Sequence, residues 1–259
     1  MKKKLSVVKI GGNVLENEVE LHKFLDAFSA MEGPKILVHG GGKLATQIAH
    51  RLGIESKMIG GRRITDAEGL KIITMVYGGL ANKNIVAQLQ ARGTNAIGLS
   101  GADGNTIRAV KRPVKDIDYG FAGDVEEVNT LAIYQLLQAE FTPVFCAITH
   151  NKEGQLLNTN ADTIASEVAI GMSDAFDTTL YYCFEKKGVL LDIADEDSVV
   201  KHLEPINYQE LLENKIIADG MLPKLENCFH ALHKNVGKVC IGDISMLAPN
   251  ATLFTTITL

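Results

Sequence analysis

Short runs of apolar, often β-branched residues alternate along this chain with segments in which apolar residues recur every three or four positions. The runs predict strands, and the spaced segments predict helices with one buried face. This alternation favours an α/β fold, a three-layer αβα sandwich whose open sheet is mostly parallel and is covered by helices on both faces. The clearest predicted strands are residues 5–10, 35–39, 96–99 and 142–149.

Two helical patterns lie between these strands. Leu44, Ile48 and Leu52 recur about one turn apart and predict a helix at residues 44–52. Residues 66–92 carry a second, longer pattern, for which Thr65 or Asp66 is a suitable N-cap. The apolar positions that predict its buried face are Leu70, Ile73, Tyr77 and Leu80.

The middle of the chain changes character. Residues 106–128 form short alternating pieces with Gly120 and Gly123, and residues 151–154 are typical of a hairpin turn, so antiparallel strands are expected there. After residue 171 the α/β pattern resumes. It predicts strands near Leu180 and Val239 and helices at residues 208–214 and 222–234. We therefore expect two lobes, residues 1–172 and 173–259, built on one continuous sheet.

Composition narrows the range of functions. The 26 basic and 31 acidic residues give a formal net charge of −5 and form no basic patch, which argues against nucleic acid as a partner. No apolar run approaches the roughly 20 residues that cross a bilayer, so we expect a cytoplasmic protein without a membrane partner. The four cysteines are far apart and lack CxxC spacing, which predicts buried, reduced thiols. The seven histidines show no HExxH spacing, and we predict no protein-bound metal.

A lysine and two glycines mark the end of the first predicted strand. Lys9 lies at its carboxyl end, and Gly11 and Gly12 follow in the turn. Open α/β sheets bind ligands at that edge. Glycines have no Cβ atom, so their backbone N–H groups can approach a phosphate, and Lys9 can add a positive charge. A tight turn with a solvated lysine explains the same residues equally well.

The second strand ends in a run of three glycines, residues 40–42, between His39 and Lys43. A glycine-rich turn at a helix N-terminus is a general anion site. This run is not a P-loop, because GxxxxGK spacing and a following Ser or Thr are absent, and it does not supply GxGxxG. Three glycines can also serve only a close contact between helix and strand. Two such loops at one sheet edge nevertheless favour phosphate binding.

Polar residues at three other helix starts are candidates for ligand binding. Arg63 precedes the long helix, and its guanidinium can hold a carboxylate through two hydrogen bonds. Asn158, Asn160 and Asp162 gather where a strand gives way to a helix. Lys224 lies near the positive end of another helix, an unfavourable place unless an anion shares the site. A surface arginine and ordinary turn or cap residues are the structural alternatives.

Taken in order, these segments resemble the amino-acid kinase superfamily, and within it the N-acetylglutamate kinase family. The resemblance covers essentially the whole chain, and the ordered set is strongly specific although each motif alone is weak. It implies a carbamate-kinase-like fold and ATP-dependent phosphorylation of the γ-carboxylate of an N-acyl-L-glutamate, by default N-acetyl-L-glutamate, in arginine and ornithine biosynthesis. The matching segments are residues 9–12, 38–42, 61–65, 75–82, 98–104, 158–162 and 219–224.

The resemblance also implies roles for the candidate residues. Lys9 and Lys224 would contact the transferred phosphoryl group, Asp162 would hold both lysines in place, and Gly11 and Gly12 would bind phosphate. Because the acceptor carboxylate is already ionised at neutral pH, no general base is needed, and catalysis consists of positioning and charge neutralisation. ATP would carry Mg²⁺ itself. The residues that would bind the acyl-glutamate are Gly41, Gly42, Arg63, Asn158 and Asn160.

The same resemblance assigns acyl-glutamate binding and dimerisation to the first lobe and nucleotide binding to the second. Residues 183–188 depart from the family pattern, because Glu185 stands where the family usually has an aspartate, before Gly188. Both are candidate nucleotide contacts, with a reach altered by the longer side chain. Relatives inhibited by arginine carry an additional N-terminal helix that joins dimers into hexamers, so an arginine-insensitive homodimer is expected here.

Alternatives remain at the level of the sequence. An N-succinyl-L-glutamate substrate would need only a roomier or more basic acyl pocket. The atypical segment 183–188 permits a degenerate, non-catalytic amino-acid sensor, although the presence of Lys9, Asp162 and Lys224 argues against it. Glutamate 5-kinase, carbamate kinase and uridylate kinase match the Arg63 and Asn158 segments less well. A dehydrogenase would need the GxGxxG fingerprint that this chain lacks.

Overall fold

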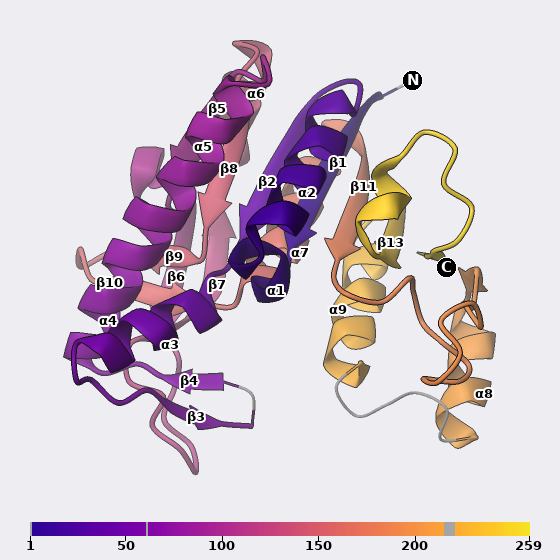
Figure 1. Cartoon of the computed structure of the whole chain (residues 1–259). Coiled ribbons are helices and arrows are strands. Elements are labelled where there is room, and N and C mark those ends of the chain that lie inside the picture. Colours follow the sequence, from indigo (N-terminus) through magenta and orange to yellow (C-terminus); the bar gives the residue numbers. More distant parts are fainter. Residues whose placement is uncertain (1, 61, 215–220) are drawn as a thin grey trace. The chain divides into compact units, whose positions relative to one another are not determined.

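The computed structural model describes residues 2–60, 62–214 and 221–259, and contacts between residues divide the chain into two compact units (Figure 1). Unit 1 consists of Met1–Ile36 and Ala165–Leu259, and unit 2 is Leu37–Ile164. The chain thus leaves unit 1 once and returns to it once. This division places the first strand with the C-terminal segment, whereas the predicted lobes divide the chain only at residue 172.

Unit 1 is built on strands that run mostly parallel. β1 (Lys3–Ile10) pairs in parallel with β11 (Phe176–Cys183), and β11 pairs in parallel with β13 (Lys238–Gly242). β14 (Thr255–Ile257) then runs antiparallel to β13 and parallel to β12 (His202–Leu203). Apolar residues of β1 are almost fully buried, which confirms the predicted first strand and explains why it lies inside the sheet.

The helices of unit 1 follow from local signals in the sequence. Asn17 caps α2 by accepting a hydrogen bond from the Glu20 N–H at 3.2 Å, and Phe24 and Phe28 stack on its buried side. In Figure 1, α2 lies across the near face of β1. The helical elements of unit 1 are α1 (Gly12–Glu16), α2 (Glu18–Ala30), most of α7 (Ala161–Met172), α8 (Pro205–Glu213), α9 (Leu222–His233) and the 3₁₀ turn η3 (Ile244–Leu247).

Unit 2 contains three groups of strands. β2 (Lys35–His39), of which residues 37–39 belong to this unit, and β5 (Ala96–Leu99) flank β8 (Thr142–Cys146), and both pair with it in parallel. β3 (Lys57–Ile59) and β4 (Arg62–Ile64) form an antiparallel hairpin. The third group is a small closed barrel of β6 (Ile107–Lys111), β7 (Ala122–Val128), β9 (Ile148–His150) and β10 (Leu156–Thr159).

The barrel confirms two predictions and corrects one. β6 and β7 are antiparallel, as expected for residues 106–128, and β9 and β10 form the hairpin predicted around residues 151–154. The single strand predicted at residues 142–149 is wrong. It ends at Cys146, and after Ala147 the chain enters the barrel as β9. Because residues 142–149 are all buried, their sequence gives no sign of the change from one sheet to the other.

The long predicted helix of unit 2 is a composite. It starts as α4 (Ala67–Ile73), capped by Asp66 as expected, widens into the π-helix η1 (Thr74–Ala81) and continues as α5 (Asn82–Gln90). Leu80 is 46% exposed and is not on the buried face that we predicted for it. The π-helical turns contain an extra residue, so they rotate the positions after Tyr77 away from the expected register.

The remaining helices of unit 2 are α3 (Gly42–Arg51), α6 (Thr130–Gln138) and the 3₁₀ turn η2 (Asp103–Asn105). The buried side of α3 consists of Ala45 and Ala49, whereas Leu52 is 59% exposed, which corrects the predicted apolar face. Small residues on the buried side allow α3 to approach its neighbours closely. Figure 1 shows α5 in front of β5 and β8 in this unit.

These elements confirm the α/β class with a mostly parallel sheet. All four cysteines are buried and unpaired by disulfides, as predicted. Across residues 2–60, 62–214 and 221–259, the helices are too short or too polar to span a membrane.

Candidate active site

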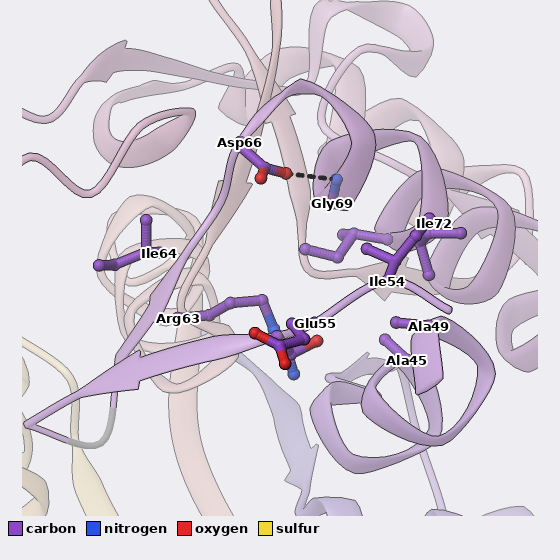
Figure 2. Close-up of a pocket in the computed structure, with 11 residues that line it drawn as sticks. Ala45, Ala49, Ile54, Glu55, Arg63, Ile64, Asp66, Gly69 and Ile72 are labelled. Carbon is purple, nitrogen blue, oxygen red and sulfur yellow. Dashed lines mark hydrogen bonds between the residues drawn. The ribbon is translucent and has the colours of Figure 1, made fainter. Parts of the chain in front are cut away.

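Arg63 lies beside the start of α3 in unit 2. Its Nη2 donates hydrogen bonds to the Gly42 carbonyl and to Thr46 Oγ1, both at 2.7 Å. Arg63 belongs to β4, where it pairs with Met58. In Figure 2 its side chain runs from β4 toward α3, and it lines a small pocket together with Ala45, Ala49 and Glu55. The structure therefore brings Arg63 to the second glycine loop, and carboxylate binding by Arg63 stays a prediction.

The guanidinium of Arg63 lies near the positive end of the α3 dipole. The first turn of a helix carries partial positive charge on its N–H groups, so a guanidinium there is unfavourable on its own. α3 has no acidic residue in its first turn to offset it. A bound carboxylate would satisfy both the N–H groups and the guanidinium. That Arg63 and residues 41–44 bind an anion stays a prediction.

Tyr77 shapes the glycine loop. Gly41 has a φ of 150°, and a Cβ atom on it would lie 2.9 Å from the Tyr77 ring, so only glycine fits there. Burial raises the pKa of the Tyr77 phenol, while the Arg63 guanidinium, which shares a hydrogen bond with it, acts in the opposite direction. Tyr77, Arg63 and Gly41 thus form one cluster. The sequence pattern predicts only a helix face for Tyr77, because a periodic position gives no sign of this contact.

Asn158 reaches the same part of unit 2 through Thr65. Its Nδ2 donates to Thr65 Oγ1 at 2.9 Å, and Thr65 is fully buried. Residues 119–121 link the two segments: the Thr65 N–H bonds to the Tyr119 carbonyl, and the Asn158 N–H bonds to the Phe121 carbonyl. Arg63 and Asn158 are therefore held on a common framework, although 93 residues separate Thr65 from Asn158 along the chain.

Asn160 and Asp162 lie at the start of α7. Asn160 Oδ1 accepts hydrogen bonds from the N–H groups of Asp162, at 2.7 Å, and Thr163, at 3.2 Å. Asn160 thus caps the helix, which is the structural alternative to ligand binding given for it in the sequence analysis. Asp162 is half-buried in the first turn of α7, where a carboxylate is favourable for the helix dipole. Their roles toward a ligand stay predictions.

The remaining phosphate-site candidates belong to unit 1. Lys9 is half-buried near the end of β1, opposite Tyr182 of β11. The Gly11 N–H donates to the Cys183 carbonyl at 3.2 Å, so a phosphate would have to replace that bond to use this amide. Gly12 begins α1, and a Cβ atom there would meet no other atom within 4 Å, which leaves its backbone approachable.

Lys224 lies in the first turn of α9, also in unit 1, whereas Asp162 is in unit 2. Residues 219 and 220 of the matching segment 219–224 fall outside the described residues. That Lys9, Lys224 and Asp162 converge on one phosphoryl group stays a prediction.

The nucleotide candidates differ in their surroundings. Glu185 is exposed, just after the end of β11. Gly188 is buried, and a Cβ atom there would lie 2.6 Å from Thr255 Oγ1 and 2.8 Å from Val199 Cγ1. The close packing around position 188 is enough to require glycine there, without any contact to a nucleotide. Nucleotide contacts by either residue stay predictions.

His230 and Cys228 occupy ordinary surface and core positions of the helix α9. His230 is exposed, 3.6 Å from a Glu167 carboxylate oxygen, while Cys228 is fully buried. Within the part of the chain that the structure describes, no three His, Cys, Asp or Glu side chains cluster as metal ligands.

Comparison of the sequence with those of known proteins identifies the protein family. The sequence profile of the amino acid kinase family matches residues 4–243, and the chain belongs to that family. It is 58% identical to the acetylglutamate kinase of Phocaeicola vulgatus, over 93% of this chain and 94% of that protein.

Solved structures agree on the fold. The smu.665 protein of Streptococcus mutans UA159 is 27% identical and superposes with a TM-score of 0.77 over 98% of both chains. Carbamate kinase from Giardia lamblia, 13% identical, superposes with a TM-score of 0.66 over 99% of this chain and 98% of that one. The second likeness concerns the fold alone, and it agrees with the expected carbamate-kinase-like architecture.

Proposed function

We propose that this protein transfers the terminal phosphoryl group of ATP to the γ-carboxylate of N-acetyl-L-glutamate, forming an acyl phosphate in arginine biosynthesis. The observation that carries the proposal is the cluster of Arg63 with the first turn of α3, beside the Thr65–Asn158 pair. It offers a guanidinium and helix N–H groups for a carboxylate and an amide for an acylamino group. The 58% identity to a protein named acetylglutamate kinase supports the same substrate.

In this mechanism the two units have different tasks. Arg63 and Asn158 of unit 2 hold the α-carboxylate and the acylamino group, so that the side-chain carboxylate faces the nucleotide. The carboxylate is the nucleophile and already ionised, so no residue has to remove a proton. Lys9 and Lys224 neutralise the negative charge on the transferred phosphoryl oxygens, and Asp162 orients the two ammonium groups.

Magnesium belongs to the nucleotide in this proposal. Mg²⁺ prefers octahedral coordination by phosphate oxygens and water, with one or two carboxylates at most. ATP thus brings the cation with it. The lysines and backbone N–H groups of the protein help Mg²⁺ to neutralise the negative charge of the phosphate oxygens. We further propose a cytoplasmic homodimer, for which light scattering should give twice the chain mass of 28.1 kDa.

An ATP-coupled assay with glutamate, N-acetylglutamate and N-succinylglutamate side by side tests the proposal. We expect turnover with N-acetylglutamate. If only free glutamate reacts, the acyl-glutamate assignment fails. A preference for N-succinylglutamate would change the acyl group and keep the reaction, and ATP binding without turnover on any substrate would indicate a sensor.

Arg63→Lys should raise the KM for N-acetylglutamate on the order of 10- to 100-fold and change the KM for ATP little. Lysine keeps the charge but cannot bind a carboxylate with two parallel hydrogen bonds, a loss worth about 1.5–3 kcal/mol. Initial-rate kinetics with each substrate varied would measure both constants. The matched control is Arg62→Lys, the exposed neighbour in β4. An equal rise in KM for both variants would contradict a specific role for Arg63.

A further inference from the structure

His39 is a fully buried histidine at the end of β2, directly before the glycine loop formed by residues 40–42. Its Nδ1 lies 2.8 Å from the Gly40 carbonyl oxygen, and its Nε2 lies 3.0 Å from Asn82 Nδ2. Both ring nitrogens thus have partners inside unit 2. Neither the reaction mechanism above nor the sequence motifs give this ring a task.

The partners fix the proton on the ring. A carbonyl oxygen can only accept, so Nδ1 carries the hydrogen and donates to Gly40. Asn82 Nδ2 also donates, at 2.9 Å, to the Val144 carbonyl, so it is the amide nitrogen and Nε2 of His39 is the acceptor. Burial lowers the pKa of His39 to about 4, which agrees with a neutral ring at physiological pH.

Asn82 anchors the histidine to the rest of the sheet in unit 2. It is 1% exposed, at the point where η1 passes into α5, and Lys83 Nζ donates to its Oδ1 at 3.2 Å. A Cβ atom on Gly98 of β5 would lie 2.0 Å from Asn82 Oδ1, so glycine is required there. The side chain of Asn82 is therefore packed against β5 and hydrogen-bonded to β8 and to His39 of β2. The ring of His39 cannot shift without disturbing two neighbouring strands.

The peptide group between Gly40 and Gly41 links His39 to the direction of a backbone N–H in the glycine loop. The chain has no cis peptide in its described part, so the bond between Gly40 and Gly41 is trans and planar. In such a group the C=O and N–H point in opposite directions. Because His39 holds the Gly40 carbonyl, it also sets the direction of the Gly41 N–H, which points away from the ring. Glycines on both sides of the bond would otherwise allow this peptide to rotate.

We propose that His39, held by Asn82, is a positioning residue that aims the backbone N–H of Gly41 at the reacting oxygens of the substrate. The inference rests on the proposed function and adds to it that the glycine loop, residues 40–42, contacts the side-chain carboxylate as it becomes an acyl phosphate. Such an N–H helps only if it is already oriented when charge develops in the transition state. A free glycine loop would have to be ordered at each turnover.

Two variants of the same residue separate the two ring nitrogens. The amide nitrogen of asparagine can occupy the place of Nδ1, so His39→Asn retains a donor for Gly40. Glutamine reaches the place of Nε2, so His39→Gln retains a partner for Asn82 and loses the donor to Gly40. We expect His39→Gln to lower kcat on the order of 100-fold, with the KM for N-acetylglutamate changed less than about threefold. His39→Asn should keep a kcat at least about tenfold above that of His39→Gln.

Controls distinguish this inference from a merely structural role. Thermal unfolding should show similar losses of stability in both variants, because each removes ring volume and one hydrogen bond. His50→Gln, at an exposed histidine of α3, should leave kinetics unchanged. If kcat falls equally in both His39 variants and in proportion to stability, the positioning role is overturned.

A second measurement does not depend on activity. Long-range ¹H–¹⁵N correlation spectra of the wild-type protein should show His39 protonated at Nδ1 and bare at Nε2. The opposite tautomer would overturn the inference even in an active enzyme. Failure of the wild-type protein to phosphorylate any acyl-glutamate would instead remove the proposed function. The two failures are therefore distinguishable.

Discussion

Replacing Lys9 with alanine is expected to lower kcat about a thousandfold. The proposed reaction has no acid or base to lose, so its rate depends on groups that neutralise charge on the moving phosphoryl oxygens. Removing one preorganised donor of this kind costs roughly 3–4 kcal/mol in the transition state. Initial rates at saturating ATP and N-acetylglutamate measure the loss directly. Lys224→Ala should have an effect of similar size.

Lys3→Ala is the matched control for this experiment, because Lys3 is an exposed lysine at the start of the same strand. Its kcat should equal that of the wild type. Lys9→Ala should also unfold at nearly the wild-type temperature, since a half-exposed ammonium contributes little to stability. Wild-type turnover in Lys9→Ala would remove the lysine from the mechanism.

Gly120→Ala should lower the free energy of unfolding of unit 2 by about 3–5 kcal/mol. Gly120 has a φ of 67°, and a Cβ atom there would lie 2.2 Å from the Thr65 carbonyl oxygen and 2.9 Å from its carbon. These are backbone atoms that cannot rotate aside, and the Thr65 carbonyl accepts a hydrogen bond from Phe121. Urea denaturation followed by circular dichroism measures the change. Because Thr65 also holds Asn158, binding of N-acetylglutamate should weaken as well.

Gly154→Ala separates the contact from the backbone conformation. Gly154 has a φ of 81°, but a Cβ atom there would meet no other atom within 4 Å. Its replacement should cost only the penalty of a left-handed residue, about 1–2 kcal/mol. Equal losses in the two variants would mean that the close approach to Thr65 contributes nothing.

Much of the fold is readable from the sequence because strands and helices follow local patterns. β1, β2 and β5 fall where apolar runs predict them, and Asp66 caps the long helix as expected. The glycine loops are also recognisable in the sequence, and at Gly41 the close approach of the Tyr77 ring requires a residue without a Cβ atom.

Other features have no local signal. Leu80 satisfies a period of 3.6 residues, but the preceding π-helical turns move it to the surface. Residues 142–149, which span β8 and most of β9, are all buried, so no exposed break in this run reveals that the two strands belong to different sheets. In both cases tertiary packing decides between conformations that the sequence permits.

The contacts that support the candidate site are the least predictable part. His39 and Asn82 are 43 residues apart, and each is inconspicuous in its own segment. Tyr77 fits a helix face, yet its ring also lies against Gly41, which belongs to a distant segment of the chain. Such pairs depend on how distant elements meet, which periodicity and capping rules do not specify.

The buried thiols give this protein built-in reporters of local opening. Burial raises the pKa of Cys146 to about 12 and that of Cys240 to about 11, so hardly any reactive thiolate exists in the closed state. Alkylation must therefore wait for transient exposure. Cys146 belongs to unit 2, while the three others belong to unit 1. Mass spectrometry can follow the order in which iodoacetamide labels the four cysteines. That order would show which unit opens locally at the higher rate and whether a bound ligand lowers the rate of opening.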